Sequence, residues 1–265
     1  MCFYLDRPLN FAHRGASYEA PANTLAAFQS AVELGADGIE FDVHLSKDGE
    51  MVVIHDFVLD ATTDGHGPVR ARTLAELKEL DAGIWFDPSF AGQRIPTLQE
   101  VVEAVGDCLL LNVEIKTMSL RGEGLAESVV RLIEDNHLSD QVIVSSFNPL
   151  AVWRVKRLNP RIPVGLLYSP EQPLFLRKLW FRHVIRAEAV HPDYRLVDGE
   201  YVRWAREQGY RIHTWTVDDP AAMRQLMHDG VDIIISNRPD LLGQVLEQRA
   251  SDPRSGQVQP AGPGQ

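Results

Sequence analysis

The sequence has few of the features that mark secreted, disulfide-stabilised or membrane-spanning proteins. Only two of its 265 residues are cysteines, Cys2 and Cys108, and they form no CxxC motif, so we expect reduced thiols and no disulfide framework. No apolar run approaches the roughly 20 residues that span a bilayer. Met1–Asn10 also lacks the basic start and long apolar core of a signal peptide. These absences predict a cytoplasmic protein.

Positive charge is scarce as well. The chain has 26 lysines and arginines against 37 aspartates and glutamates, which gives a formal net charge of -11. Proteins that bind DNA or RNA over a wide surface are usually basic, so nucleic acid is not an expected partner. An anionic substrate is still possible, provided that a metal ion or a few basic side chains neutralise it locally.

Short β-like runs alternate with helical patterns through most of the chain, which favours a parallel sheet with crossover helices. The length suits one large α/β barrel or two small domains. We count nine candidate strands for the eight positions of a barrel, so one of them is expected to lie outside it. The candidates are residues 10–13, 38–43, 51–55, 110–116, 142–147, 163–168, 189–194, 211–217 and 231–236.

Three segments depart from this alternation. Residues 45–50 are too few for a crossover helix, so the geometry of the second and third candidate strands stays open. Residues 57–96 are rich in Gly, Pro, Asp and Thr and are expected to form an insertion within a barrel of residues 8–248. Residues 250–265 contain Pro, Gly and Ser but no aromatic residue, and are expected to be a disordered tail.

The first helix can be placed from its flanking residues. Asn23 is a candidate N-cap, and Leu25, Phe28 and Val32 then share one face of the helix. Gly35 is expected to end it. Later helices are expected at 73–80, 97–105, 124–136, 149–158, 201–208 and 220–228.

Charged residues cluster where the strands end, which is where barrel enzymes place their catalytic groups. Glu40 and Asp42 are two residues apart on a strand, so both side chains point to the same face. Two neighbouring carboxylates repel each other unless a cation binds, and Glu114 could supply a third oxygen. An all-oxygen site suits Mg²⁺ or Ca²⁺. The spacing of Glu40 and Asp42 fits equally well with two solvated acids on a strand whose faces alternate.

Two histidines and two basic residues also end strands. His13 and His55 are a candidate acid–base pair, because histidine titrates near neutral pH. The alternative for each is a hydrogen-bonded core histidine. Arg14 and Lys116 are suited to hold a phosphate, although Lys116 can instead pair with a carboxylate on its own strand. His44 continues the face of the acidic pair, and we expect it to be a surface residue rather than a ligand.

These residues belong to longer motifs. The run AHRGASYEAPANTLAAFQSAVELGADGIEFDVHLSKDGEMVVIHD, from Ala12 to Asp56, closely resembles the opening of the glycerophosphodiester phosphodiesterase family. NVEIK, SSF, HTWTVDD and ISNRPD resemble later landmarks of that family, and the resemblance covers about residues 8–245. Each motif is weak alone, but the set in this order and spacing is highly specific.

The resemblance implies a distorted (β/α)8 TIM barrel with a small insertion after the third strand. It also implies hydrolysis of a small-molecule glycerophosphodiester to sn-glycerol 3-phosphate and an alcohol, with one divalent cation, Mg²⁺ or Ca²⁺. It does not say which histidine is the acid. The implied roles are metal binding for Glu40, Asp42 and Glu114, acid–base catalysis for His13 and His55, phosphate binding for Arg14 and Lys116, and lining of the substrate pocket for Phe147 and Trp215.

One departure and two alternatives accompany this resemblance. Family members often have an Arg-Thr-Thr run where this chain has Asp60–Thr63 (DATT), which puts details of the insertion in doubt. Residues 174–186 (LFLRKLWFRHVIR) are basic and aromatic. They fit either an ordinary barrel helix or a segment that contacts anionic lipid at a membrane surface. The second interpretation would support an alternative function, lysophospholipase D-like cleavage of lysophospholipids at that surface. A non-catalytic phosphodiester-binding barrel is the other alternative, although both histidines and all three acids are present. The oligomeric state is not indicated.

Overall fold

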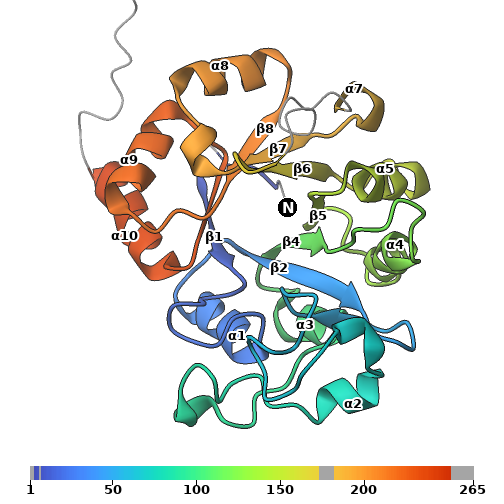
Figure 1. The fold of residues 1–265 in the computed structure, drawn as a ribbon. Helices are drawn as coiled ribbons and strands as arrows, with labels where there is room; N and C mark the ends of the chain where they lie inside the picture. Colours follow the sequence, from blue (N-terminus) through green and yellow to red (C-terminus); the bar gives the residue numbers. More distant parts are fainter. Residues whose placement is uncertain (1–2, 6, 173–181, 252–265) are drawn as a thin grey trace, which may run out of the picture.

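The computed structural model describes residues 3–5, 7–172 and 182–251, and these form a closed barrel of eight parallel strands surrounded by helices (Figure 1). Each barrel strand pairs in parallel with its two neighbours, and pairing of β1 with both β2 and β9 closes the ring. The predicted TIM barrel is therefore confirmed. The barrel strands are β1 (Leu9–His13), β2 (Gly38–Leu45), β4 (Leu110–Ile115), β5 (Val142–Ser146), β6 (Val164–Tyr168), β7 (Ala189–Pro192), β8 (Arg211–Thr214) and β9 (Ile233–Ser236).

The ninth strand, β3 (Met51–Val53), lies outside the barrel, as the count of candidates required. It pairs antiparallel with the end of β2, in the register Val43↔Val53. The two strands form a hairpin whose turn is held by Ser46, because its hydroxyl donates to Asp48 and accepts from the amide of Glu50. A hairpin explains how six residues suffice to connect them.

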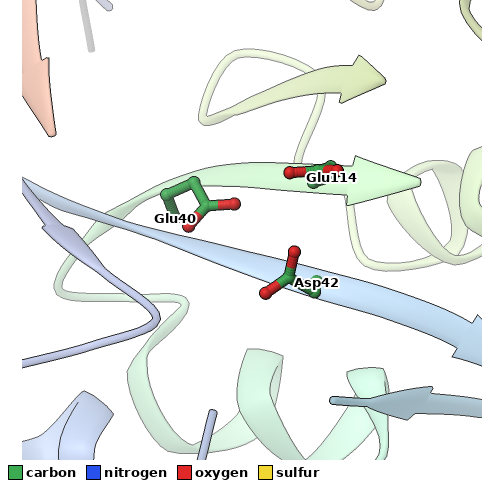
Figure 2. Close-up of side chains that lie close together, drawn as sticks. All are labelled: Glu40, Asp42 and Glu114. Atoms are coloured by element: carbon green, nitrogen blue, oxygen red, sulfur yellow. The ribbon is translucent and has the colours of Figure 1, made fainter. Parts of the chain in front are cut away.

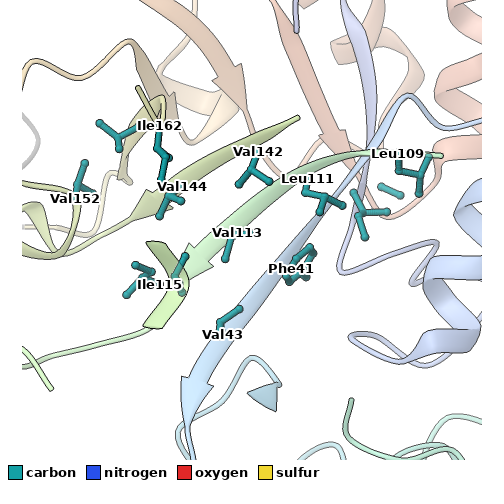
Figure 3. Packing of buried hydrophobic residues seen from close by; sticks show 14 of the residues in the cluster. Phe41, Val43, Leu109, Leu111, Val113, Ile115, Val142, Val144, Val152 and Ile162 are labelled. Atoms are coloured by element: carbon teal, nitrogen blue, oxygen red, sulfur yellow. The ribbon is translucent and has the colours of Figure 1, made fainter. Parts of the chain in front are cut away.

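The strands of the barrel alternate between two buried faces. On β2, Glu40 and Asp42 point into the barrel (Figure 2). Phe41 and Val43 point outward and pack in the apolar layer between strands and helices, beside Val113 of β4 (Figure 3). All of these residues are buried. Since water is excluded from both faces, the inward-pointing carboxylates must be paired or bound to a cation.

The helices alternate with the strands and cover the outside of the barrel (Figure 1). The first, α1 (Leu25–Glu33), is capped by Thr24, whose hydroxyl accepts from the amide of Ala27. The prediction that Asn23 caps this helix is wrong, because Asn23 has a left-handed backbone with φ of 61°. Outside residues 57–96, the remaining described helices are α3 (Leu98–Val105), α4 (Leu125–Asp135), α5 (Pro149–Leu158), α7 (Arg182–Ile185), α8 (Gly199–Glu207), α9 (Pro220–Asp229) and α10 (Pro239–Ser251), with a short 3-10 helix at Tyr194–Leu196.

Residues 57–96 contribute no strand to the barrel and pack around a second, smaller apolar cluster. They contain α2 (Leu74–Lys78) and two 3-10 turns, Val69–Ala71 and Pro88–Phe90. Thr73 and Glu76 form a reciprocal capping box at the start of α2. The members of the cluster are Val52, Ile54, Leu59, Val69, Leu77, Ala82 and Ile95. This segment therefore has its own core, built partly on β3 and the loop after it.

Two expectations fall largely outside the described residues. The basic and aromatic segment 174–186 overlaps residues 173–181, and the expected tail 250–265 overlaps residues 252–265. Within the described ranges, none of the helices has the length and apolar character needed to cross a membrane.

Candidate active site

Three carboxylates meet at the mouth of the barrel and form what we call the acidic cluster. Glu40 and Asp42 come from β2 and Glu114 from the adjacent β4, where Asp42 and Glu114 lie in register (Figure 2). One oxygen from each lies within 4.8 Å of the other two, and all three residues are buried. Oε2 of Glu40 is buried and has no hydrogen-bond partner within the described part of the chain. An arrangement of this kind suits a hard divalent cation.

Two basic side chains border the acidic cluster. Lys116 follows β4 directly, and its Nζ lies 2.9 Å from Oε1 of Glu114 and 3.4 Å from Oδ1 of Asp42. Nε of Arg14 lies 3.3 Å from Oδ2 of Asp42. Three carboxylates thus face two cations, which leaves one excess negative charge when all are ionised. A divalent cation would reverse that sign and make the site attractive to an anionic phosphodiester.

The pKa values in the cluster follow from burial and from these neighbours. Burial raises the pKa of Glu40 well above its usual value, and the charges of Asp42 and Glu114 add to the shift. Burial raises the pKa of Glu114 to about 7 against the opposing effect of Lys116. For Asp42, burial opposes ionisation, but Lys116 and Arg14 outweigh it and lower the pKa to about 2. Bound cation would favour the ionised form of all three.

A tight turn after β1 positions Arg14. Arg14 has φ of 56° and Gly15 has φ of 82°, and the amide of Arg14 donates to the carbonyl of Glu40 at 2.7 Å. A Cβ at position 15 would lie 2.6 Å from the backbone of Ala27. Glycine is therefore required here for both conformation and space, and it lets the chain turn from β1 directly over the carboxylates.

His13, at the end of β1, is oriented by a side chain that the sequence analysis did not identify. Asn237 follows β9; its Nδ2 donates to Asp218 at 2.6 Å, so its Oδ1 faces His13 and accepts from Nδ1 at 2.7 Å. This leaves Nε2 of His13 pointing toward Oε2 of Glu40, 3.8 Å away. Burial and the charge of Arg14 lower the pKa of His13 to about 4. The ISNRPD motif contained Asn237, but its contact with His13 depends on barrel closure.

His55 has a different partner. Its Nδ1 donates to the carboxylate of the next residue, Asp56, at 2.7 Å, which leaves Nε2 as the acceptor of the neutral ring. Burial lowers the pKa of His55, while the charge of Asp42 opposes this effect. The two candidate catalytic histidines thus differ in that one is held by an amide and the other by a carboxylate.

The prediction that His44 is a surface residue is wrong. His44 is 5% exposed, and its Nε2 donates to the carbonyl of His55 at 3.0 Å. Its ring meets the ring of Phe57 edge-on at 4.8 Å. The hairpin folds β3 and the residues after it back along β2, so a side chain that continues the acidic face is covered. His44 supports the backbone that carries His55.

Asn23 is a second functional candidate that the sequence analysis misplaced. Its Nδ2 donates to Oδ2 of Asp42 at 2.9 Å, and its Oδ1 accepts from the amide of Asp42. Thr24, one residue later, is also a favoured helix cap. That alternative was the available signal that Asn23 was free for another role.

The predicted pocket residues Phe147 and Trp215 lie together beside the acidic cluster. Their rings meet edge-on with centroids 5.5 Å apart, and Nζ of Lys116 lies 6.0 Å from the centre of the Phe147 ring. The indole Nε1 of Trp215 donates to the carbonyl of His191 at 2.8 Å, which fixes its orientation. All nine candidate residues therefore lie at the same end of the barrel.

These features define a barrel that has, at its mouth, an acidic cluster able to hold a divalent cation and two histidines, which is where barrel enzymes place their catalytic groups. The glycerophosphoryl diester phosphodiesterase family model matches residues 13–241. A glycerophosphodiester phosphodiesterase of Caldanaerobacter subterraneus subsp. tengcongensis is 43% identical, over 89% of this chain and 96% of that protein. One of Bacillus subtilis is 34% identical, over 91% of this chain and 87% of that protein.

A solved structure supports the same assignment. A phosphodiesterase of Oleispira antarctica, in complex with the product sn-glycerol-3-phosphate, is 31% identical and superposes with a TM-score of 0.79, over 91% of this chain and 97% of that one. The chain belongs to the glycerophosphoryl diester phosphodiesterase family and is an enzyme of that class.

Proposed function

We propose that this enzyme hydrolyses small glycerophosphodiesters to sn-glycerol 3-phosphate and an alcohol, with one divalent cation and with His13 and His55 as acid–base pair. The observation that carries the proposal is the buried acidic cluster at the barrel mouth, flanked by two cations and two histidines of defined orientation.

The residues present fit the proposed cation. Glu40, Asp42 and Glu114 are oxygen donors, and the unpaired Oε2 of Glu40 has no protein partner among the described residues that would compensate for its burial. Mg²⁺ and Ca²⁺ both accept such donors. When bound, the ion supplies charge neutralisation for the phosphate.

The protein side chains supply the remaining steps. Arg14 and Lys116 hold the phosphate oxygens and stabilise the negative charge that accumulates in the transition state. We assign the general base to His55, because the carboxylate of Asp56 stabilises the imidazolium that forms when the ring takes a proton. His13, held by a neutral amide at Nδ1, acts in its imidazolium form, which the negative charge of a bound phosphodiester would favour, and it delivers the proton on Nε2 to the leaving alcohol. Phe147 and Trp215 exclude water from the organic part of the substrate.

Release of sn-glycerol 3-phosphate from glycerophosphocholine, with Mg²⁺, with Ca²⁺ and with EDTA, tests the proposal. We expect turnover that needs a divalent ion and is lost in Glu40→Ala and His13→Ala variants, while Glu33→Gln, a change on the exposed surface of α1, retains it. Turnover that persists in EDTA after exhaustive dialysis would contradict the role of the cation.

A substrate with a good leaving group separates the two histidines. A p-nitrophenyl phosphodiester needs little protonation of its leaving group, so the loss in His13→Ala should shrink on it, while the loss in His55→Ala should persist. If the loss of activity in His55→Ala shrinks instead, the roles of acid and base are reversed. If each variant loses the same activity on both substrates, the assignment is contradicted.

Two alternatives differ in a measurable way. A non-catalytic barrel would bind divalent ions and phosphodiester in calorimetry but release no product. Peripheral membrane contact through residues 174–186 remains a prediction, as does the cytoplasmic location. The contact would be supported if the wild-type protein sediments with anionic vesicles and the Trp180→Ala and Arg182→Ala variants do not.

A further inference from the structure

Two buried polar atoms on neighbouring strands of the barrel have complementary hydrogen-bonding needs. Oε2 of Glu40, on β2, is an acceptor, and Nδ2 of Asn112, on β4, is a donor. Neither atom has a hydrogen-bond partner within the described part of the chain, although the two residues are only 5% and 1% exposed. A buried polar atom without a partner is destabilising, so each of these atoms requires an explanation.

The pairing of β2 with β4 places the two residues side by side. Glu40 and Asn112 are register partners in this parallel pair, two positions before the partners Asp42 and Glu114. Adjacent strands lie about 4.8 Å apart, and residues two apart on a strand point to the same face. Asn112 therefore points into the barrel like Glu114, and its unpaired donor lies within reach of the unpaired acceptor of Glu40.

The amide of Asn112 is oriented by the strand on its other side. Ser145, on β5, is fully buried, and its hydroxyl donates to Oδ1 of Asn112 at 2.9 Å. Since β4 lies between β5 and β2, the oxygen of this amide is engaged on the β5 side. The nitrogen is then the end of the amide that remains for Glu40 on β2.

Glu40 is also the member of the acidic cluster that has the least support from basic side chains. Asp42 lies within 4.0 Å of both Arg14 and Lys116, and Glu114 lies within 4.0 Å of Lys116. Among the described residues, no lysine or arginine forms such a pair with Glu40. A neutral donor from the neighbouring strand would supply the missing support.

His13 is less suited to this role than Asn112. Its Nε2 lies 3.8 Å from Oε2 of Glu40, which is too long for a hydrogen bond. In the proposed function, this nitrogen gives its proton to the leaving alcohol. An ionised carboxylate has about four lone-pair sites, so Glu40 can accept from an amide and still bind a cation.

We propose that Asn112 is a positioning residue for Glu40: its amide nitrogen donates to the ionised carboxylate and holds it in place for the cation, while Ser145 fixes the orientation of the amide. A hydrogen bond to a charged acceptor is stronger than a neutral one. The inference rests on the proposed function, because it takes Glu40 as a ligand of the cation.

Calorimetric affinity for Mg²⁺ and for Ca²⁺ tests the inference without turnover. Asn112→Leu roughly keeps the volume of the side chain but removes the donor, so the affinity should fall by about tenfold or more. Asn10→Leu is the matched control. Asn10 is also a buried asparagine of a barrel strand, but its amide donates to the carbonyl of Pro239 in α10. This variant should bind the cation as the wild type does.

The outcomes separate this inference from the proposed function. If the wild type binds the cation and folded Asn112→Leu binds it equally well, the inference is overturned and the proposed function stands. Equal losses in Asn112→Leu and Asn10→Leu would also overturn the inference, because they would reflect general destabilisation. A wild-type protein that binds neither ion would contradict both.

Ser145→Ala is a milder variant that removes only one hydroxyl. An amide that samples both orientations equally presents its nitrogen to Glu40 half of the time, so the cation affinity should fall about twofold. In the Asn112→Leu background, the same substitution should cause no further loss. Wild-type affinity in Ser145→Ala, or a further loss in the double variant, would overturn the role of Ser145.

Nuclear magnetic resonance of the wild-type protein tests the proposed hydrogen bond even if Asn112→Leu does not fold. Addition of Ca²⁺ should move the side-chain amide protons of Asn112 downfield, because their acceptor is then held as a carboxylate. The side-chain amide of Asn10 should keep its chemical shift. If the signals of Asn112 do not move while the cation binds, the inference is overturned.

Discussion

The interior of the barrel contains two buried polar regions. In one, buried charges are compensated by opposite charges; in the other, the titratable groups are neutral. The acidic cluster at the mouth keeps charge, and Arg14 and Lys116 pair with it. Deeper in the barrel, His191 and His213 form what we call the histidine pair, with ring centroids 4.4 Å apart and both residues fully buried. Burial lowers the pKa of His191 to about 3 and that of His213 well below its usual value. The pair is therefore neutral.

The packing around the histidine pair shows how closely it is enclosed. A Cβ on Gly165 of β6 would lie 2.2 Å from Nε2 of His191, so glycine provides the space for this ring. The hydroxyl of Tyr4 lies 3.0 Å from Nε2 of His213. Neither ring nitrogen of His191 has a partner within the described residues. The comparison indicates that charge is concentrated where the proposed chemistry takes place, and that the histidine pair in the barrel interior is kept neutral.

The largest effect is expected from removing a charge at the mouth. Glu114→Gln keeps the shape of the side chain but removes a proposed cation ligand and the partner of Lys116, so kcat/KM should fall by about 10²–10³-fold. Calorimetric affinity for Mg²⁺ or Ca²⁺ should fall in parallel. Glu33→Gln is the matched surface control. If the Glu114→Gln variant binds Mg²⁺ or Ca²⁺ with wild-type affinity, Glu114 is not a ligand of the cation.

The histidine pair should make the protein sensitive to acid. His191 has an ordinary pKa near 6.5 when unfolded and about 3 when folded, so the unfolded state binds the proton first. Its contribution to stability is complete above pH 6.5 and is lost progressively as the pH falls toward 3. At pH 4.5 the loss is about 2–3 kcal/mol.

The substitution His191→Asn isolates this effect. The variant should lose part of its stability at pH 8, but its free energy of unfolding should decline less between pH 7 and pH 4.5 than that of the wild type, as urea titrations at each pH would show. His137→Asn, in the loop after α4, is the matched control. Parallel pH profiles for wild type and His191→Asn would show that His191 can be protonated without unfolding.

Orientation of the mouth histidines should matter less than the acidic cluster. Asn237→Ala removes the acceptor for Nδ1 of His13, so kcat should fall by about tenfold while KM changes little. The pH–rate profile should shift, because the hydrogen bond with Asn237 favours protonation of His13. Asn237→Asp, which restores an acceptor, should recover part of the rate. A loss that is the same in both variants and leaves the pH profile unchanged would indicate a purely structural role.

The smallest effect is a pH-dependent stabilisation by cation. Glu114 has a folded pKa of about 7 against an ordinary value of 4.5, so folding of the cation-free protein is favoured by protonation below pH 7 and this benefit is lost as the pH rises through 7. Protons and cation therefore compete for the cluster. Addition of Mg²⁺ or Ca²⁺ should raise the melting temperature by a few degrees more at pH 8 than at pH 5.5. An equal shift at both values would contradict proton competition.

Much of the fold and of the site was predictable because the signals are local. Glu40 and Asp42 had to share a face because they are two residues apart on a strand, and both were expected to need a cation. The alternation of strand and helix patterns predicted a parallel sheet with crossover helices, and the resemblance to the family specified the barrel, for which one of the nine candidate strands was surplus. Local signals failed where two assignments competed, as at Asn23 and Thr24, and where a hairpin covered a residue such as His44.

The sequence by itself therefore determined the order of the elements and the type of chemical group that each strand brings to the mouth of the barrel. Tertiary structure decided which groups meet: Asn237 reaches His13 across 224 positions, and the histidine pair joins residues from separate strands. The physical reason is that side-chain periodicity is set within a few residues, whereas contacts across the barrel depend on closure and register of all eight strands.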